Sequence, residues 1–268
     1  NTTNWYQTYQ TMTVTSSGGS WLMNGVKPNV AEAPGLVSES LTWETVETYN
    51  IGLDWGLFNN RLTGSFDYYV RNTLDMVGYA QQLPAVLGTD VPVTNNTDLR
   101  TSGWELTLGW QDRLKNGLSY GVKFNLYDSR TKITRYPNNP TNSIDSETYI
   151  EGRYMNEIWG YTTVGIAKTD EEMNAHLATL PNGGQDELGS NWGAGDIMYK
   201  DVDEDGKISA GSGVLGDTGD MTVIGNSTPR FHFGLDLNAA WKGFDVRLFF
   251  QGVMKRDYWE GSTYLFGA

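Results

Sequence analysis

The fold is decided by one short stretch, Asn50-Ile51-Gly52-Leu53-Asp54-Trp55-Gly56-Leu57, in which apolar and polar residues alternate strictly. A β-strand sends successive side chains to opposite faces, so one face of this strand is apolar and the other is small or charged. The longer stretches of this kind run for about ten residues, the length of a tilted strand that crosses a bilayer. Further alternating stretches lie at residues 62–71, 105–110, 122–126, 231–241 and 244–251.

Two architectures produce this alternation. In a soluble β-sandwich the apolar face packs against a second sheet, whereas in a membrane barrel it faces lipid and closure leaves no unpaired edge. The polar faces are rich in Gly, Ser, Thr, Asn and Asp, which suits a wet lumen. Aromatic residues also gather toward strand ends, as in the interfacial girdle of a membrane barrel. They are Trp55, Phe58, Tyr68, Tyr69, Trp104, Trp110 and Trp241.

Composition narrows the range of partners and chemistry. The chain has 268 residues and a net charge of −13, which excludes nucleic acid as an expected partner because phosphate binding needs a basic surface. It has no cysteine, so disulfides and cysteine-based chemistry are excluded. The chain contains no run of 18 apolar residues, the length that would predict a transmembrane helix. A barrel strand carries a much weaker sequence signal than such a helix.

Short turns and long connections alternate along the chain. Short turns are expected at residues 59–60, 115–117 and 242–243, where Asn and Gly tolerate the left-handed backbone of a hairpin turn. Long loops are expected at about 72–98, 133–160 and 168–228. This order matches the short periplasmic turns and long extracellular loops of an outer-membrane barrel.

One helix is predicted, within the last of these long loops. Thr169 is its expected N-cap and Glu172 completes a capping box, and the helix should run to about Leu180 before Pro181. Strands are predicted at about 5–14, 21–26, 42–58, 61–71, 101–112, 118–132, 161–167, 229–241 and 244–254.

Several longer motifs occur in a fixed order. Leu41-Thr42-Trp43-Glu44 is followed by an alternating hairpin over residues 49–69, and then by Ser102-Gly103-Trp104-Glu105-Leu106-Thr107-Leu108. Next come residues 195–208, which end in Asp201-Val202-Asp203-Glu204-Asp205-Gly206-Lys207-Ile208, and finally residues 223–245. In these motifs and their spacing, residues 40–255 resemble the C-terminal third of the SusC/RagA family of TonB-dependent outer-membrane transporters.

The resemblance implies an all-β fold: a segment of an antiparallel transmembrane β-barrel with long extracellular loops and one short loop helix. It implies TonB-dependent import of oligomeric glycan or peptide across the outer membrane of a Gram-negative cell, with a SusD-like surface lipoprotein as partner. We expect residues 1–268 to form a partial barrel domain in contact with outer-membrane lipid. The plug domain is expected to be absent, and contact with TonB to run through the missing N-terminal part. Seven to nine strands are too few for such a barrel, which has about 22.

The sharpest local motif is the acidic stretch at residues 201–208. Carboxylates of Asp201, Asp203 and Asp205 stand at positions 1, 3 and 5 of a calcium loop, and the Lys207 carbonyl can add a ligand. Ser212 stands where an EF-hand has its bidentate Glu, so Asp217 or Asp220 is expected to replace that ligand. We predict Ca²⁺ at this loop, where it would stiffen an extracellular connection. The alternative is a solvated acidic turn without an ion.

Aromatic side chains in the long loops are candidates for cargo binding, because they can stack on sugar rings or peptide side chains. Ordinary loop packing and anchoring at the barrel rim are the alternative roles. No catalytic residues are expected, and the chain is predicted not to be an enzyme. The candidate substrate-binding residues are Trp159, Tyr161, Trp192 and Tyr199.

Two other functions fit parts of the pattern. One is a secreted β-sandwich that binds glycan through surface aromatics, and the other is a calcium-stabilised adhesion module. The sandwich predicts that a second layer of the same chain covers the apolar face of the strands. The membrane barrel predicts that this face lies uncovered by protein.

Overall fold

The computed structural model describes residues 12, 14–16, 22–31, 36–39, 41–79, 91–144 and 149–261. The strand predicted at residues 5–14 lies almost wholly outside these residues. Within the stretch predicted as a strand at 21–26, Met23 and Val26 form an isolated antiparallel bridge across a turn. A small hairpin of β1 (Val14–Ser16) and β2 (Asn29–Ala31) is the other element of this N-terminal part.

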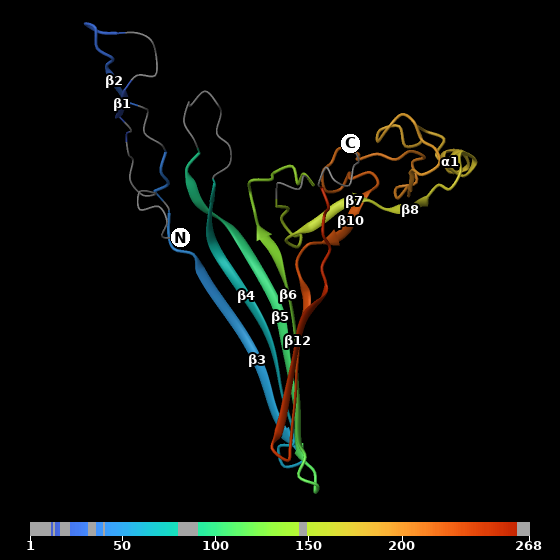
Figure 1. The fold of residues 1–268 in the computed structure, drawn as a ribbon. Coiled ribbons are helices and arrows are strands. Elements are labelled where there is room, and N and C mark those ends of the chain that lie inside the picture. Colours follow the sequence, from blue (N-terminus) through green and yellow to red (C-terminus); the bar gives the residue numbers. More distant parts are fainter. Residues whose placement is uncertain are drawn as a thin grey trace.

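The main element is a six-stranded antiparallel sheet with the order β12-β11-β6-β5-β4-β3. Figure 1 shows its strands running side by side from the short turns at one end to the long connections at the other. The all-β fold predicted from the alternation is therefore confirmed. The strands are β3 (Thr45–Leu57), β4 (Leu62–Tyr79), β5 (Val93–Arg113), β6 (Ser119–Arg135), β11 (Arg230–Trp241) and β12 (Phe244–Lys255).

The three predicted short turns are present. Lys242 and Gly243 have φ values of 48° and 87°, and the flanking Trp241 and Phe244 pair directly. Asn59 and Asn60 also have left-handed backbones, with φ of 59° and 61°. In the third turn Gly117 has φ of 87°, so each turn contains positive-φ residues, as a tight hairpin requires.

The loop predicted at residues 72–98 is shorter than expected, because strand continues into it from both sides. β4 runs on to Tyr79 and β5 begins at Val93. The pairing between them shifts register around Met76, next to Asp75 with φ of 56°. Such a bulge breaks the period-two alternation, so the sequence pattern hides the end of each strand.

A compact lobe lies beyond the sheet, at the end with the long connections (Figure 1). We call residues 157–226 the loop lobe. It contains two separate two-stranded ribbons, so the single strand predicted at 161–167 is divided between them. Its elements are β7 (Glu157–Tyr161), β8 (Thr163–Ile166), α1 (Asp170–Leu177), β9 (Ile197–Tyr199) and β10 (Met221–Asn226).

Helix α1 begins as predicted. Thr169 is the N-cap, and its hydroxyl accepts the backbone N–H of Glu172 at 3.2 Å. The helix ends at Leu177, three residues earlier than expected, because Thr179 and Leu180 form tighter turn bonds to His176 and Leu177. No helix in the described part of the chain has the length and apolar character needed to span a membrane.

The register of the sheet aligns apolar residues in rows that cross all six strands. In one of these rows the Trp55 indole covers its cross-strand partner Gly64, where an added Cβ would lie 2.1 Å from the ring. We call the surface that these rows form the apolar belt; along β4 it runs from Leu62 to Val70. Three of its rows are Leu53, Phe66, Leu106, Leu126, Phe233 and Gly252; Trp55, Gly64, Leu108, Phe124, Leu235 and Phe250; and Leu57, Leu62, Trp110, Val122, Leu237 and Leu248.

The apolar belt lies uncovered by protein. Leu53, Phe66 and Phe250, from three strands of the belt, are 65%, 40% and 51% exposed. Among the described residues, the elements in substantial contact are hydrogen-bonded neighbours within one sheet, and no second layer packs across the belt. Buried apolar side chains gather instead in the loop lobe, around Met173 and Met198. The β-sandwich alternative is therefore wrong for the described chain.

The opposite face of the sheet is polar. Thr107 donates a hydrogen bond to Asn125 at 3.2 Å, and Asp236 accepts a bidentate bond from Arg247. Near the short turns this face holds a hollow of about 480 Å³, whose lining includes Thr63, Ser65 and Lys123. The two faces thus differ as the alternation of the sequence predicts.

Candidate metal and ligand site

The acidic loop at residues 201–208 lies in the loop lobe, between β9 and β10. Ile208 at its end is fully buried, and its N–H donates to the Gly184 carbonyl at 2.7 Å. Asn182 makes two further bonds, from its N–H to the Gly206 carbonyl and from its side-chain amide to the Asp205 carbonyl. The turn that follows α1 therefore fixes the shape of the loop.

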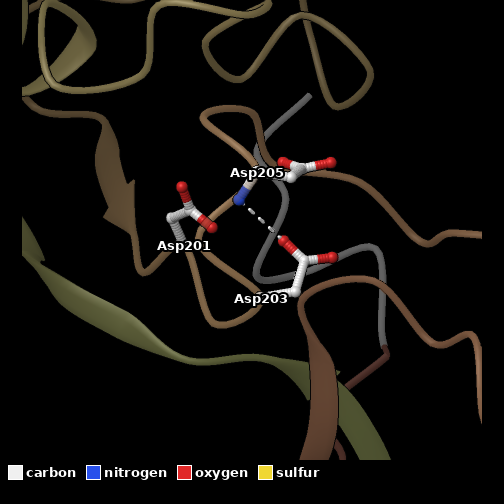
Figure 2. Close-up of side chains that lie close together, drawn as sticks. All are labelled: Asp201, Asp203 and Asp205. Atoms are coloured by element: carbon white, nitrogen blue, oxygen red, sulfur yellow. Dashed lines mark hydrogen bonds between the residues drawn. The ribbon is translucent and has the colours of Figure 1, made fainter.

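The loop brings the carboxylates of Asp201, Asp203 and Asp205 together (Figure 2). One oxygen from each lies within 4.8 Å of the others. Backbone N–H groups of the same loop hold them: Gly206 donates to Asp201 at 2.8 Å and Lys207 donates to Asp205 at 3.0 Å. Gly206 has φ of 83°, so the glycine expected at the sharp turn has the backbone that favours glycine.

Asp201 carries a buried oxygen without a partner. Its Oδ2 accepts the Gly206 N–H, but its Oδ1 is shielded from solvent and has no hydrogen-bond partner among the described residues. Partial desolvation and the neighbouring carboxylates raise the pKa of Asp203 above its ordinary value. A buried carboxylate oxygen without a partner is energetically costly. A hard cation such as Ca²⁺, which binds carboxylate oxygens, would supply that partner.

Asp220 holds this loop by both ends. It is fully buried, and its two carboxylate oxygens accept the N–H groups of Val202 at 2.6 Å and Ser209 at 2.8 Å. Because both oxygens are engaged, Asp220 positions the loop and is not a free ligand. Its distance from the acidic stretch in sequence hides this role.

The other two predicted ligands lie differently. Lys207 directs its ammonium toward Glu187, at 3.6 Å, so only its carbonyl is left for a metal. Asp217 is outside the group of three carboxylates and accepts the Ser212 N–H at 3.3 Å. The structure therefore brings together three of the predicted ligand side chains and leaves Asp217 apart.

The candidate aromatic residues form one cluster and one separate contact. The rings of Tyr161 and Tyr199 lie 5.6 Å apart, and Trp192 meets Tyr199 edge to face at 6.4 Å. Trp192 also packs against the buried core of the lobe. Trp159 stands apart, beneath the Arg153 guanidinium at 5.1 Å. Desolvation raises the pKa of the Tyr161 phenol, and the nearby charges of Glu187 and Asp220 add to it.

Gln185 joins β9 to helix α1, a role that no sequence motif indicates. This side chain is fully buried; its carbonyl accepts the Tyr199 N–H at 2.7 Å and its amide donates to the Ile197 carbonyl at 3.1 Å. Its carbonyl also lies 3.1 Å from Nε2 of His176 on α1. One polar side chain therefore joins β9 to the helix.

A large antiparallel sheet with one apolar and one polar face, closed at one end by short turns, is the architecture of a barrel wall. The sequence profile of the family described as "TonB dependent receptor-like, beta-barrel" matches residues 2–254. The chain belongs to this family. The family is a class of receptors rather than of enzymes.

Individual relatives agree with this assignment. TonB-dependent receptor P3 of Formosa agariphila is 29% identical over 226 residues, covering 81% of this chain and 21% of that protein. TonB-dependent receptor SusC of Bacteroides thetaiotaomicron is 29% identical over 119 residues, covering 44% of this chain and 11% of SusC. The chain spans between 11% and 22% of the length of the curated relatives it matches.

Solved structures give the same fold. A chain of the RagAB peptide importer in its "closed-closed" state superposes with a TM-score of 0.61 at 21% identity, covering 92% of this chain and 24% of that one. The "open-open" state of the same importer gives a TM-score of 0.59 at 22% identity. The resemblance to the SusC/RagA family of TonB-dependent receptors is therefore confirmed.

Replacement of Asp220 with Asn tests how the loop is held. Asn keeps one acceptor but turns an amide donor toward a backbone N–H, so one charge-assisted bond is lost. We expect local opening of residues 201–209 to become easier by about 2 kcal/mol, measured by hydrogen exchange at Val202 and Ser209. The exposed Asp217→Asn change is the matched control, and equal exchange in both variants would show that Asp220 does not hold the loop.

Proposed function

We propose that this chain is part of the barrel wall of an outer-membrane importer that takes up oligomeric nutrients, glycan or peptide, with energy from TonB. The proposal extends the family assignment to cargo, energy source and location. A SusD-like surface lipoprotein is its expected partner, as the resemblance to SusC and RagA implies. The chain does no bond chemistry in this proposal; it encloses a passage.

The apolar belt is the observation that carries the proposal. Along β4 its outward positions run from Leu62 to Val70, which is about 26 Å of strand at about 3.3 Å per residue. Strands of membrane barrels tilt by about 40°, so this length covers roughly 20 Å of bilayer thickness, close to the ≈ 25 Å lipid-facing band of such barrels. Hydrocarbon is the environment that this uncovered surface fits.

The inward face suits the passage of hydrophilic cargo. Polar side chains such as Thr107, Asn125 and Asp236 line it, and it lies opposite the belt on every strand of the sheet. At the end with the long connections, Tyr161, Tyr199 and Trp192 lie together, and Trp159 stands apart from them on β7. We propose that these aromatics contact cargo on the extracellular side.

We also propose that residues 201–207 bind one Ca²⁺ ion. Asp201, Asp203 and Asp205 would supply side-chain oxygens and Lys207 its carbonyl. The buried, unpartnered Oδ1 of Asp201 supports this assignment. With Asp220 fixing both ends of the loop, the ion would stiffen the loop lobe rather than take part in a reaction.

The import function is tested on the full-length parent protein. Expressed in a Gram-negative host, it should fractionate with outer membranes and need detergent for extraction. Cells that carry it should take up labelled oligosaccharides or oligopeptides, and deletion of TonB should abolish that uptake. A protein that is monodisperse without detergent would rule out the proposal.

The direction of each face is tested by a matched pair of substitutions. Leu106 lies in the middle of the apolar belt, and its neighbour Thr107 points to the polar face. Leu106→Arg should destabilise the barrel by about 2–4 kcal/mol, the cost of a cation at the bilayer midplane, whereas Thr107→Arg should cost much less. Folding yield is read from the heat-modifiable band of the parent protein, and equal loss in both variants would contradict the assignment of faces.

Calcium binding is tested by titration of the purified parent protein after treatment with chelator. We expect one Ca²⁺ with a Kd on the order of 10⁻⁴ to 10⁻³ M, the range of extracellular sites. Asp203→Asn should weaken binding at least tenfold, whereas Asp217→Asn should leave it unchanged. Isothermal titration calorimetry measures both, and an unaltered Kd in the Asp203 variant would refute the site.

A further inference from the structure

Three cationic side chains stand on the outward face of the sheet, Arg130 in the Val70 row that ends the apolar belt and Arg100 and Lys132 in the row beyond it. In the register, Arg100 of β5 lies opposite Lys132 of β6, and Arg130 lies opposite Ser102. On β5, Ser102 and Arg100 lie two and four residues before Trp104. Trp104 is in the same row as Tyr68 and Ile51. Side chains two residues apart share a face, so the cations point to the same side as the belt. We call Arg100, Arg130 and Lys132 the outer basic cluster.

The outer basic cluster is exposed and has no carboxylate partner in the described part of the chain. Other arginines nearby behave differently: Arg135 pairs with Asp98, and Arg230 pairs with Asp128. Like charges directly opposite each other on neighbouring strands are destabilising. The protein has a net charge of −13, yet among the described residues these adjacent cations have no acidic side chain paired with them to offset their repulsion.

The surroundings of the cluster suit an anionic head group. Arg100 and Lys132 line a hollow of about 630 Å³, together with polar residues that include Tyr136 and Asn142. Glu151 also borders this hollow, but the backbone N–H of Tyr136 donates to its carboxylate at 3.1 Å. On the belt side, the Arg130 guanidinium lies 4.0 Å from the centre of the Tyr154 ring, which fixes its position.

We propose that the outer basic cluster binds the phosphate groups of the glycolipid that forms the outer leaflet. This inference rests on the proposed function, because only a barrel in the outer membrane turns this face toward lipid head groups. Arg100 lies four residues beyond Trp104, about 13 Å along the strand. Aromatic rings such as Tyr68 and Trp104 mark the interface of a membrane barrel, so the cations lie at head-group level.

The chemistry of the three side chains agrees with this level. Arginine binds phosphate through two parallel hydrogen bonds, and lysine adds a compact positive charge. Basic residues beside a membrane are attracted to its anionic surface. Cargo passes on the opposite face of the sheet, and Ca²⁺ would be repelled, so neither accounts for these cations.

The test uses the full-length parent protein purified from outer membranes in one detergent. One variant carries Arg100→Gln, Arg130→Gln and Lys132→Gln. A matched control carries Arg113→Gln, Lys115→Gln and Lys242→Gln, which removes the same charge beside the short turns. Mass spectrometry measures the phosphorylated glycolipid that co-purifies per protein. We expect at least a threefold loss in the cluster variant and no change in the control.

A second measurement uses the wild-type protein alone, so it does not depend on how well the variants fold. The protein is placed in lipid nanodiscs that contain the glycolipid with its phosphates or after enzymatic dephosphorylation. The phosphorylated form should raise the Tm of the barrel, and the dephosphorylated form should not. Equal Tm values would overturn the inference.

The outcomes separate this inference from the proposed function. A parent protein that reaches the outer membrane but retains equal glycolipid in all variants overturns the phosphate site and leaves the import function standing. Loss of a co-purifying lipoprotein with unchanged glycolipid would assign the cluster to a protein partner instead, and would also overturn it. A protein absent from the outer membrane overturns both.

Discussion

The constraint on which this structure depends is that every strand must satisfy its backbone hydrogen bonds through its neighbours while one of its faces meets no protein. In the proposed hydrocarbon environment an unpaired N–H or carbonyl costs several kcal/mol, which requires the pairing on both sides that β4, β5, β6 and β11 have. Pairing in turn fixes register, and register decides which residue of each alternating pair points outward. The apolar belt follows from these two conditions together.

The same register also organises features outside the belt. Trp55 can lie flat over Gly64 only because the two residues are direct cross-strand partners. Arg100 and Lys132 lie opposite each other for the same reason. A slip of one residue would turn Leu106 toward the polar face and Thr107 into the apolar belt, so the sheet tolerates very little variation in pairing.

The sequence predicted the sheet well because its period of two is a direct consequence of strand geometry. The hairpins at Asn59–Asn60 and Lys242–Gly243 and the cap at Thr169 were predictable for the same reason, since each depends on neighbours in the chain. The full lengths of β4 and β5 were not, because a bulge at Asp75–Met76 breaks the alternation. The alternation of apolar and polar residues predicts a strand only as far as its pairing stays regular.

The candidate site was predictable in part. The spacing of Asp201, Asp203 and Asp205 is enough to bring their oxygens together, because all three lie within one turn of chain. The roles of Asp220 and Gln185 were not predictable, because each acts through contacts with residues that are distant in sequence. Asp217 lies only three residues before Asp220, yet it accepts the Ser212 N–H and stays outside the group of three carboxylates.

The contrast between the two ends of the sheet has a consequence for how such a chain can change over time. At the tight hairpins, inserting or deleting one residue would shift the pairing of two strands, and selection should remove such events. In the loop lobe, whole segments can be exchanged without disturbing a single ladder bond of the six-stranded sheet. Lineages should therefore diversify almost entirely on the side with the long connections, while the opposite rim keeps its length.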